Sequence, residues 1–103
     1  MNLLTTAFSD GTLTVFLSGE IDHHTARNLR EETDETILIK RPKLTVLDFS
    51  GVTFMDSSGV GLIMGRYRLC LAWDCRLAVK GLSARDEKII RLSGLDSLID
   101  FLH

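Results

Sequence analysis

The segment from Lys43 to Ser50 constrains the fold of this chain more than any other. Its apolar residues do not alternate cleanly with polar ones; they are Leu44, Val46, Leu47 and Phe49. That pattern is typical of a strand covered on both faces, and such a strand lies in the middle of a sheet. We therefore expect a central strand here, with further strands on both sides.

Two amphipathic patterns flank this segment and predict helices. The first helix follows Asp22, a favourable N-cap residue, and runs through Ile39. Its apolar face consists of Ala26, Leu29, Thr33 and Ile37. The second helix begins at Ser57 or Ser58 and runs to about Ala72. Its apolar stripe consists of Val60, Ile63, Met64, Tyr67 and Leu71.

The remaining elements complete an α/β pattern. Alternation predicts strands over residues 3–8 and 12–18, with Gly19 ending the second and the turn at residues 9–11 forming a hairpin. Residues 76–80 predict a strand, and residues 98–102 predict a last short strand or a ragged end. Ser83 caps a third helix that Gly94 can end. That helix carries Ile89, Ile90 and Leu92. We expect a single domain over residues 1–103 with a mixed, mostly parallel sheet and an opening antiparallel pair.

Composition excludes several classes of function. A chain of 103 residues with 45% hydrophobic residues can bury one core, and its net charge of -2 provides no field for nucleic acid or an anionic membrane. The N-terminus lacks the pattern of a signal peptide, so we expect a cytoplasmic protein. Cys70 and Cys75 are expected to be buried thiols. Adjacent His23 and His24 diverge on a helix, so no metal site is expected. No cofactor is expected either, because the glycine motif described below is incomplete.

Residues 54–62, FMDSSGVGL, place two hydroxyls where the second helix begins. The unpaired N–H groups of a first helical turn favour a phosphoryl group there. Simple helix capping by Asp56 or Ser57 is the alternative explanation. Gly59, Gly61 and Gly65 each weaken the helix, and either a partner's close approach or tight packing on the sheet accounts for them.

Enzymatic and nucleotide-binding motifs are incomplete in this chain. The Gly-x-Ser-x-Gly pattern of serine hydrolases is not present around Ser57 or Ser58. A triad would have to use His23, His24 or the terminal His103. Gly59 and Gly61 lack the Lys-Ser/Thr ending of a phosphate-binding loop. These patterns favour a protein that is not an enzyme.

A second polar junction, residues 19–26 with the sequence GEIDHHTA, joins a strand to the first helix. In a parallel sheet, the loops after neighbouring strands gather at one edge. We therefore expect Asp22 to lie beside Asp56 and Ser57, so that the three share a recognition surface.

Residues 19–26 together with 54–61, FMDSSGVG, and 65–67, GRY, resemble the anti-sigma-factor antagonists, which are single STAS domains. The similarity is closest to the sporulation type, which antagonises the anti-sigma F factor, and it extends over nearly the whole chain. It implies partner switching: the unphosphorylated antagonist binds an anti-sigma factor that is also a serine kinase, and so releases the sigma factor. Phosphorylation ends that binding, and a metal-dependent serine phosphatase restores it.

The resemblance also implies roles for particular residues. The phosphate acceptor is the first serine after the aspartate, Ser57 in this sequence. The predicted partner-binding residues are Asp22, His23, Asp56, Ser57, Ser58, Gly59 and Gly61. The alternative is a STAS module that binds a nucleotide or is a structural subunit of a signalling assembly.

Overall fold

The computed structural model describes residues 3–103. Five strands form one sheet in the order β1-β2-β3-β4-β5. The strands are β1 (Leu3–Ser9), β2 (Thr12–Ile21), β3 (Leu44–Met55), β4 (Arg76–Lys80) and β5 (Asp100–Leu102). β1 is antiparallel to β2 and the remaining pairs are parallel, which confirms the predicted mixed sheet and opening hairpin. Asp10 and Gly11 both have positive φ, as a two-residue hairpin turn requires.

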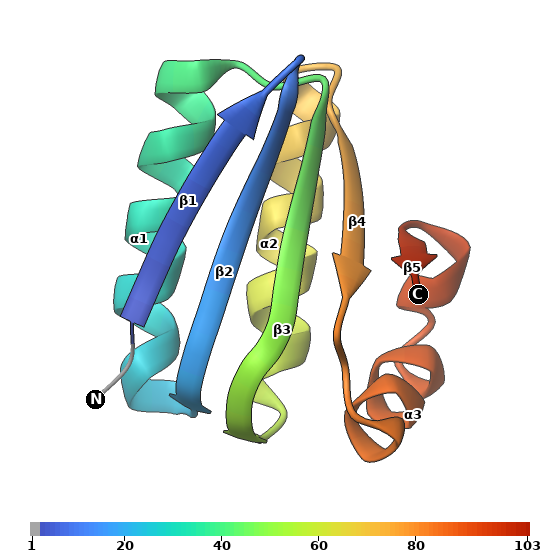
Figure 1. The fold of residues 1–103 in the computed structure, drawn as a ribbon. Helices are drawn as coiled ribbons and strands as arrows, with labels where there is room; N and C mark the ends of the chain where they lie inside the picture. Colours follow the sequence, from blue (N-terminus) through green and yellow to red (C-terminus); the bar gives the residue numbers. More distant parts are fainter. Residues whose placement is uncertain (1–2) are drawn as a thin grey trace.

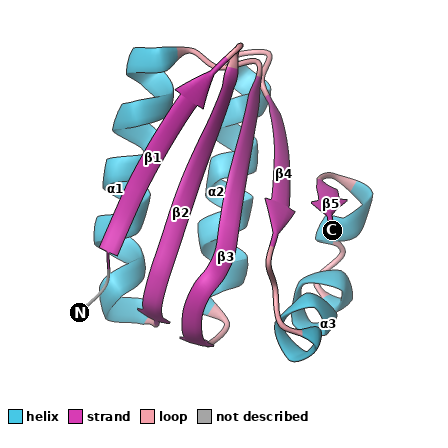
Figure 2. Cartoon of the chain, viewed as in Figure 1, coloured by secondary structure: helices cyan, strands magenta, loops and turns pink. Residues whose placement is uncertain are grey.

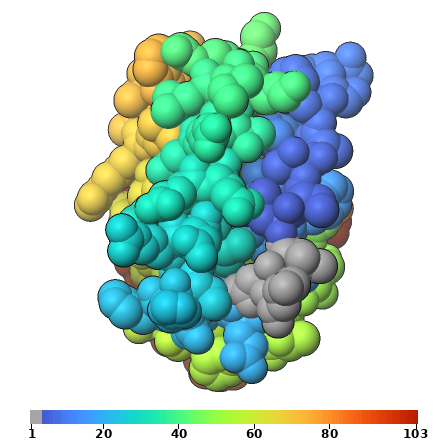
Figure 3. All heavy atoms as spheres, turned by 90° about the vertical axis from the view of Figure 1, so that its left-hand side faces the viewer, coloured from blue at the N-terminus to red at the C-terminus, as the bar shows by residue number. Residues whose placement is uncertain are grey.

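The helices are α1 (His23–Lys40), α2 (Ser58–Ala72) and α3 (Ala84–Leu92), followed by a 3-10 turn at Leu95–Ser97. α1 and α2 lie on the same face of the sheet, and both begin at the edge where β2 and β3 end (Figures 1 and 2). α3 lies beyond β4 (Figure 1). Seen from the side, α1 covers one flank of the molecule, between α2 and β1 (Figure 3).

β3 is the central strand, as predicted, and every residue from Thr45 to Phe49 is buried. The expected cover on both faces is not provided by helices, because α1 and α2 share one face (Figure 1). On the other face Val46 lies between Thr14 and Ala78 of the neighbouring strands. Strand neighbours therefore shield the second face of β3 in place of a helix layer.

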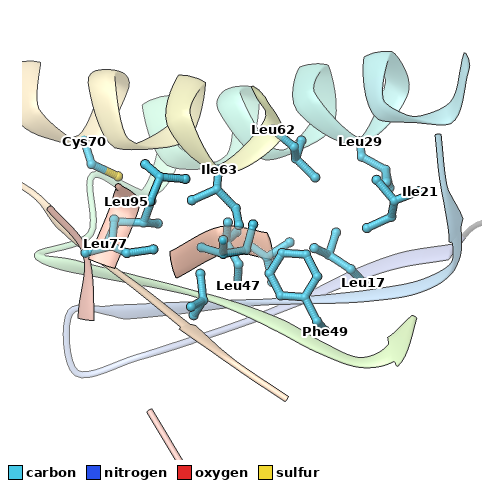
Figure 4. Packing of buried hydrophobic residues seen from close by; sticks show 14 of the residues in the cluster. Leu17, Ile21, Leu29, Leu47, Phe49, Leu62, Ile63, Cys70, Leu77 and Leu95 are labelled. Carbon is cyan, nitrogen blue, oxygen red and sulfur yellow. The ribbon is translucent and has the colours of Figure 1, made fainter. Parts of the chain in front are cut away.

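The core fills the space between the two long helices and the sheet. Leu29, Leu62 and Ile63 point from the helices toward Leu17 and Leu47 of the strands (Figure 4). At the far end of the sheet both cysteines are buried free thiols, as predicted. Burial raises the pKa of the Cys70 thiol to about 12, so this group stays protonated near neutral pH.

Two details of the predicted elements are wrong. β2 does not end at Gly19: this residue has a φ of 85° at a register shift, and the strand continues to Ile21. The left-handed backbone that glycine tolerates forms a bulge there.

The predicted stripe of α2 is wrong at Leu71, which is 66% exposed. Its other members are confirmed, because Ile63 is buried and Val60, Met64 and Tyr67 are partly buried against the core. The buried side also includes Gly59, Leu62, Arg66 and Cys70, which periodicity did not identify. Similarly, Leu92 of α3 is exposed, although Ile90 is buried.

An ion pair joins the two long helices. The Arg66 side chain of α2 is only 4% exposed, and its Nε lies 2.5 Å from Asp34 Oδ1 of α1. Arg66 Nη2 donates to Asp34 Oδ2 at 3.1 Å, and Nη1 donates to the Leu62 carbonyl at 3.1 Å. Because a buried guanidinium needs partners, these contacts fix how α1 and α2 lie against each other.

The three glycines of α2 occupy different environments. A Cβ added to Gly59 would lie 2.2 Å from Sδ and 2.5 Å from Cγ of Met55, which is fully buried. A Cβ added to Gly61 or Gly65 would meet nothing within 4 Å. Tight packing on the sheet therefore explains Gly59, whereas Gly61 and Gly65 leave open space on the helix.

This difference predicts opposite effects on stability. Gly59→Ala is expected to lower the free energy of unfolding by about 1–3 kcal/mol, because the methyl group overpacks the core beside Met55. Gly65→Ala is the matched control and is expected to raise it by about 0.5–1 kcal/mol through helix propensity. Urea denaturation measures both, and a Gly59→Ala variant as stable as the parent chain would contradict the packing explanation.

Candidate functional site

The predicted site lies where β2 and β3 end side by side. Ile21 and Met55 are paired in the parallel register, and the Asp56 amide donates to the Ile21 carbonyl at 3.1 Å. Asp22 and Asp56 are the next residues along their respective chains. The structure therefore brings together the two polar junctions that the sequence pattern placed at one edge.

Asp22 caps α1, as predicted. Its Oδ1 accepts hydrogen bonds from the amides of His24 at 2.9 Å and Thr25 at 2.8 Å. Thr25 Oγ1 in turn accepts from the Asp22 amide at 3.0 Å, which completes a capping box. The Thr25 N–H hydrogen bond is the main cause that holds the pKa of Asp22 below its ordinary value, so this carboxylate is ionised near neutral pH.

Asp56 performs the equivalent task for α2. Its Oδ1 accepts from the Ser58 amide at 2.7 Å, and its carbonyl accepts from the Gly59 amide at 3.0 Å. Ser57, the residue between them, has helical backbone angles and its side chain forms no capping hydrogen bond. The capping explanation therefore applies to Asp56 and leaves Ser57 without that role.

The two serines differ in exposure. Ser57 is exposed, whereas Ser58 is half-buried. No histidine is hydrogen-bonded to either serine within residues 3–103. The Ser57 hydroxyl is exposed and forms no capping hydrogen bond, so another protein can reach it. It lies at the positive end of a helix, where a phosphate would be favoured.

The other predicted binding residues near Ser57 differ in solvent exposure. His23 and Gly61 are exposed, while Gly59 is buried. A partner could approach Gly61 closely, because its missing side chain leaves open space. Gly59 has a packing role, and its contribution to binding stays a prediction.

A groove between the first turns of α1 and α2 adds residues that sequence reasoning missed. Its volume is about 480 Å³, and it is lined by His23, Ala26, Arg27, Arg30, Ser58, Gly61 and Leu62. Arg27 and Arg30 lie outside the predicted apolar face of α1, and both are exposed. Their spacing from His23, four and seven residues, was the available signal, since residues so spaced share a helix face.

Neither a cluster of metal-ligating side chains nor a membrane-spanning helix occurs in the described part of the chain. No three His, Cys, Asp or Glu side chains gather within residues 3–103 in a way that could hold a metal ion. None of the helices in that range is both long and apolar enough to cross a membrane.

Comparison with known proteins agrees with this architecture. The STAS domain family model matches residues 4–103. An anti-sigma F factor antagonist from Paenibacillus polymyxa is 40% identical over 85 residues, which are 82% of this chain and 73% of the relative.

Two solved structures have the same fold. The unphosphorylated form of the anti-sigma factor antagonist SpoIIAA has a TM-score of 0.82 at 28% identity, with 98% of this chain and 89% of that chain covered. The phosphorylated form of the Bacillus cell fate determinant SpoIIAA has a TM-score of 0.75, also at 28% identity, with 98% and 92% covered. The chain belongs to the STAS domain family, and its relatives there are anti-sigma factor antagonists.

Proposed function

We propose that this chain is an anti-sigma-factor antagonist that is switched by phosphorylation of Ser57. The unphosphorylated form binds an anti-sigma factor with serine kinase activity and so releases the sigma factor. Phosphate on Ser57 ends the binding, and a metal-dependent serine phosphatase removes it. The chain acts as binding partner and phosphate acceptor rather than as an enzyme, and we expect the cycle to operate in the cytoplasm.

The exposed, uncapped Ser57 hydroxyl is the observation that carries this proposal. A kinase must bring the γ-phosphate of ATP within reach of the acceptor oxygen, and a buried or hydrogen-bonded hydroxyl would have to be released first. Asp56 takes over the capping of α2, so modification of Ser57 does not remove a cap from the helix. The relatives are anti-sigma factor antagonists, and one neighbouring structure is described as phosphorylated.

The charge of the phosphate explains the loss of binding. A phosphoserine carries about -1.5 to -2 charges at pH 7, next to Asp56. Two like charges about 4 Å apart cost roughly 1 kcal/mol in water and about 4 kcal/mol at an effective dielectric near 20, as in a partly dried interface. A loss of about 3 kcal/mol corresponds to roughly hundredfold weaker binding.

Substitution of Ser57 tests the switch. Ser57→Ala is expected to abolish phosphate incorporation by the cognate kinase and to retain binding of the anti-sigma factor. Ser57→Asp is expected to weaken that binding by roughly ten- to a hundredfold, because it leaves a carboxylate on the docking surface. Ser58→Ala is the matched control for phosphate incorporation, which is expected to continue because Ser57 is intact. The cap of α2 is also retained, since the Ser58 backbone amide still donates to Asp56. Undiminished labelling of Ser57→Ala would sink the proposal.

Asp22 requires a test that separates helix capping from recognition. Asp22→Asn retains a good N-cap but removes the charge, so the thermal midpoint is expected to fall less than in Asp22→Ala, while binding of the anti-sigma factor weakens. Asp22→Ala removes both and is expected to lower the thermal midpoint as well. If Asp22→Asn binds as tightly as the parent chain, the Asp22 carboxylate has only a capping role.

A further inference from the structure

The groove between α1 and α2 opens directly beside the proposed docking surface. Ser58, the neighbour of Ser57, lines it, as does His23 at the start of α1. Its position therefore makes it continuous with the edge that carries Asp22 and Asp56.

The groove is basic. Arg27 and Arg30 line it from α1, and none of its lining residues carries a carboxylate. Both arginines are exposed. α1 and α2 begin at the same edge (Figure 1), where the carboxylates of Asp22 and Asp56 cap their first turns, so the positive charge of the groove comes from the arginines.

Neighbouring acidic residues leave much of this charge available. The Arg27 Nε lies 3.4 Å from Glu31 Oε1, but both side chains are mostly exposed, and such pairs are weak and easily exchanged. Arg30 forms no ion pair within the described part of the chain, and the nearby Asp34 is held by Arg66. Arg30 can therefore bind a carboxylate of another protein, and Arg27 can exchange Glu31 for one; the planar guanidinium geometry is well suited to this.

We propose that this groove receives an acidic segment of the partner anti-sigma factor, with Arg27 and Arg30 pairing with its Asp or Glu side chains. This inference rests on the proposed function and adds the chemistry of the contact. A volume of about 480 Å³ has room for side chains of a protein segment. Gly61 and Ala26 have little or no side chain, so they do not obstruct the groove. The binding surface then combines acidic Asp22 and Asp56 with a basic groove, which fixes the orientation of the partner.

Charge-neutralising variants test the proposal in the full-length chain. Arg27→Gln and Arg30→Gln are each expected to weaken binding of the cognate anti-sigma factor about two- to fivefold, and the double variant about tenfold, as measured by isothermal titration calorimetry. The losses are expected to shrink at about 0.5 M salt, which screens charge pairs. Arg68→Gln, an equal charge change at an exposed position of α2 outside the groove, is the matched control and is expected to bind normally.

A steric variant tests the location independently of charge. Gly61→Gln projects a side chain from a lining position whose Cβ meets nothing, so it is expected to fold normally and to weaken binding at least tenfold. Gly65→Gln, one turn farther along α2 and outside the lining residues, is the control and is expected to retain binding. Circular dichroism verifies that all variants are folded.

Several results would overturn the proposal. Full affinity in both the double arginine variant and Gly61→Gln, with Ser57→Asp still defective, would overturn the groove contact while the proposed function stands. If the parent chain fails to bind the anti-sigma factor at all, both fail together. Heat from titration with inorganic phosphate alone that Arg27→Gln abolishes would make the groove a small-anion site. A change of oligomeric state in the arginine variants would point to a second copy as the occupant.

Discussion

The parallel pairing of β2 with β3 is the constraint on which the site depends. Because Ile21 and Met55 end their strands in register, the chain leaves the sheet twice at the same edge, and each time it enters a helix. The hydrogen bond from the Asp56 amide to the Ile21 carbonyl holds the two exits together. Two helix N-termini, two capping carboxylates and an exposed serine thereby meet at one edge of the sheet. A surface of this kind is suited to docking and modification.

Different residues around Ser57 cap the helices and pack them against the sheet. Asp22 and Asp56 satisfy the free amides of α1 and α2, so the serine hydroxyl is not needed for the fold. Gly59 allows α2 to pack against Met55, while Gly61 keeps the outer side of the same helix open. Burial lowers the pKa of Arg66 and raises that of Asp34, because both charges lose solvation between the helices. Such a pair adds little net stability, but it fixes the two helices that form the walls of the groove.

The features that the sequence predicted correctly depend on residues close together in the chain. The caps at Asp22 and Ser83, the hairpin turn and the bounds of β4 depend on residues a few positions apart, and the structure confirms them. The burial of Arg66 on α2 involves Asp34, which lies 32 residues away in the chain, so periodicity within the helix could not identify it. The groove likewise joins Arg27 to Ser58, and only the packing of α1 beside α2 brings them together.

The same geometry explains why the proposed switch acts on docking and not on folding. A phosphate on Ser57 lies at the positive end of α2 and near the arginines of the groove, while the carboxylates of Asp22 and Asp56 oppose it. Within the domain these attractions and repulsions offset one another, and water screens them because Ser57 is exposed. When a partner covers this edge, water leaves and each unfavourable interaction strengthens. In the proposed cycle, one modification therefore prevents an interaction without requiring the domain to unfold.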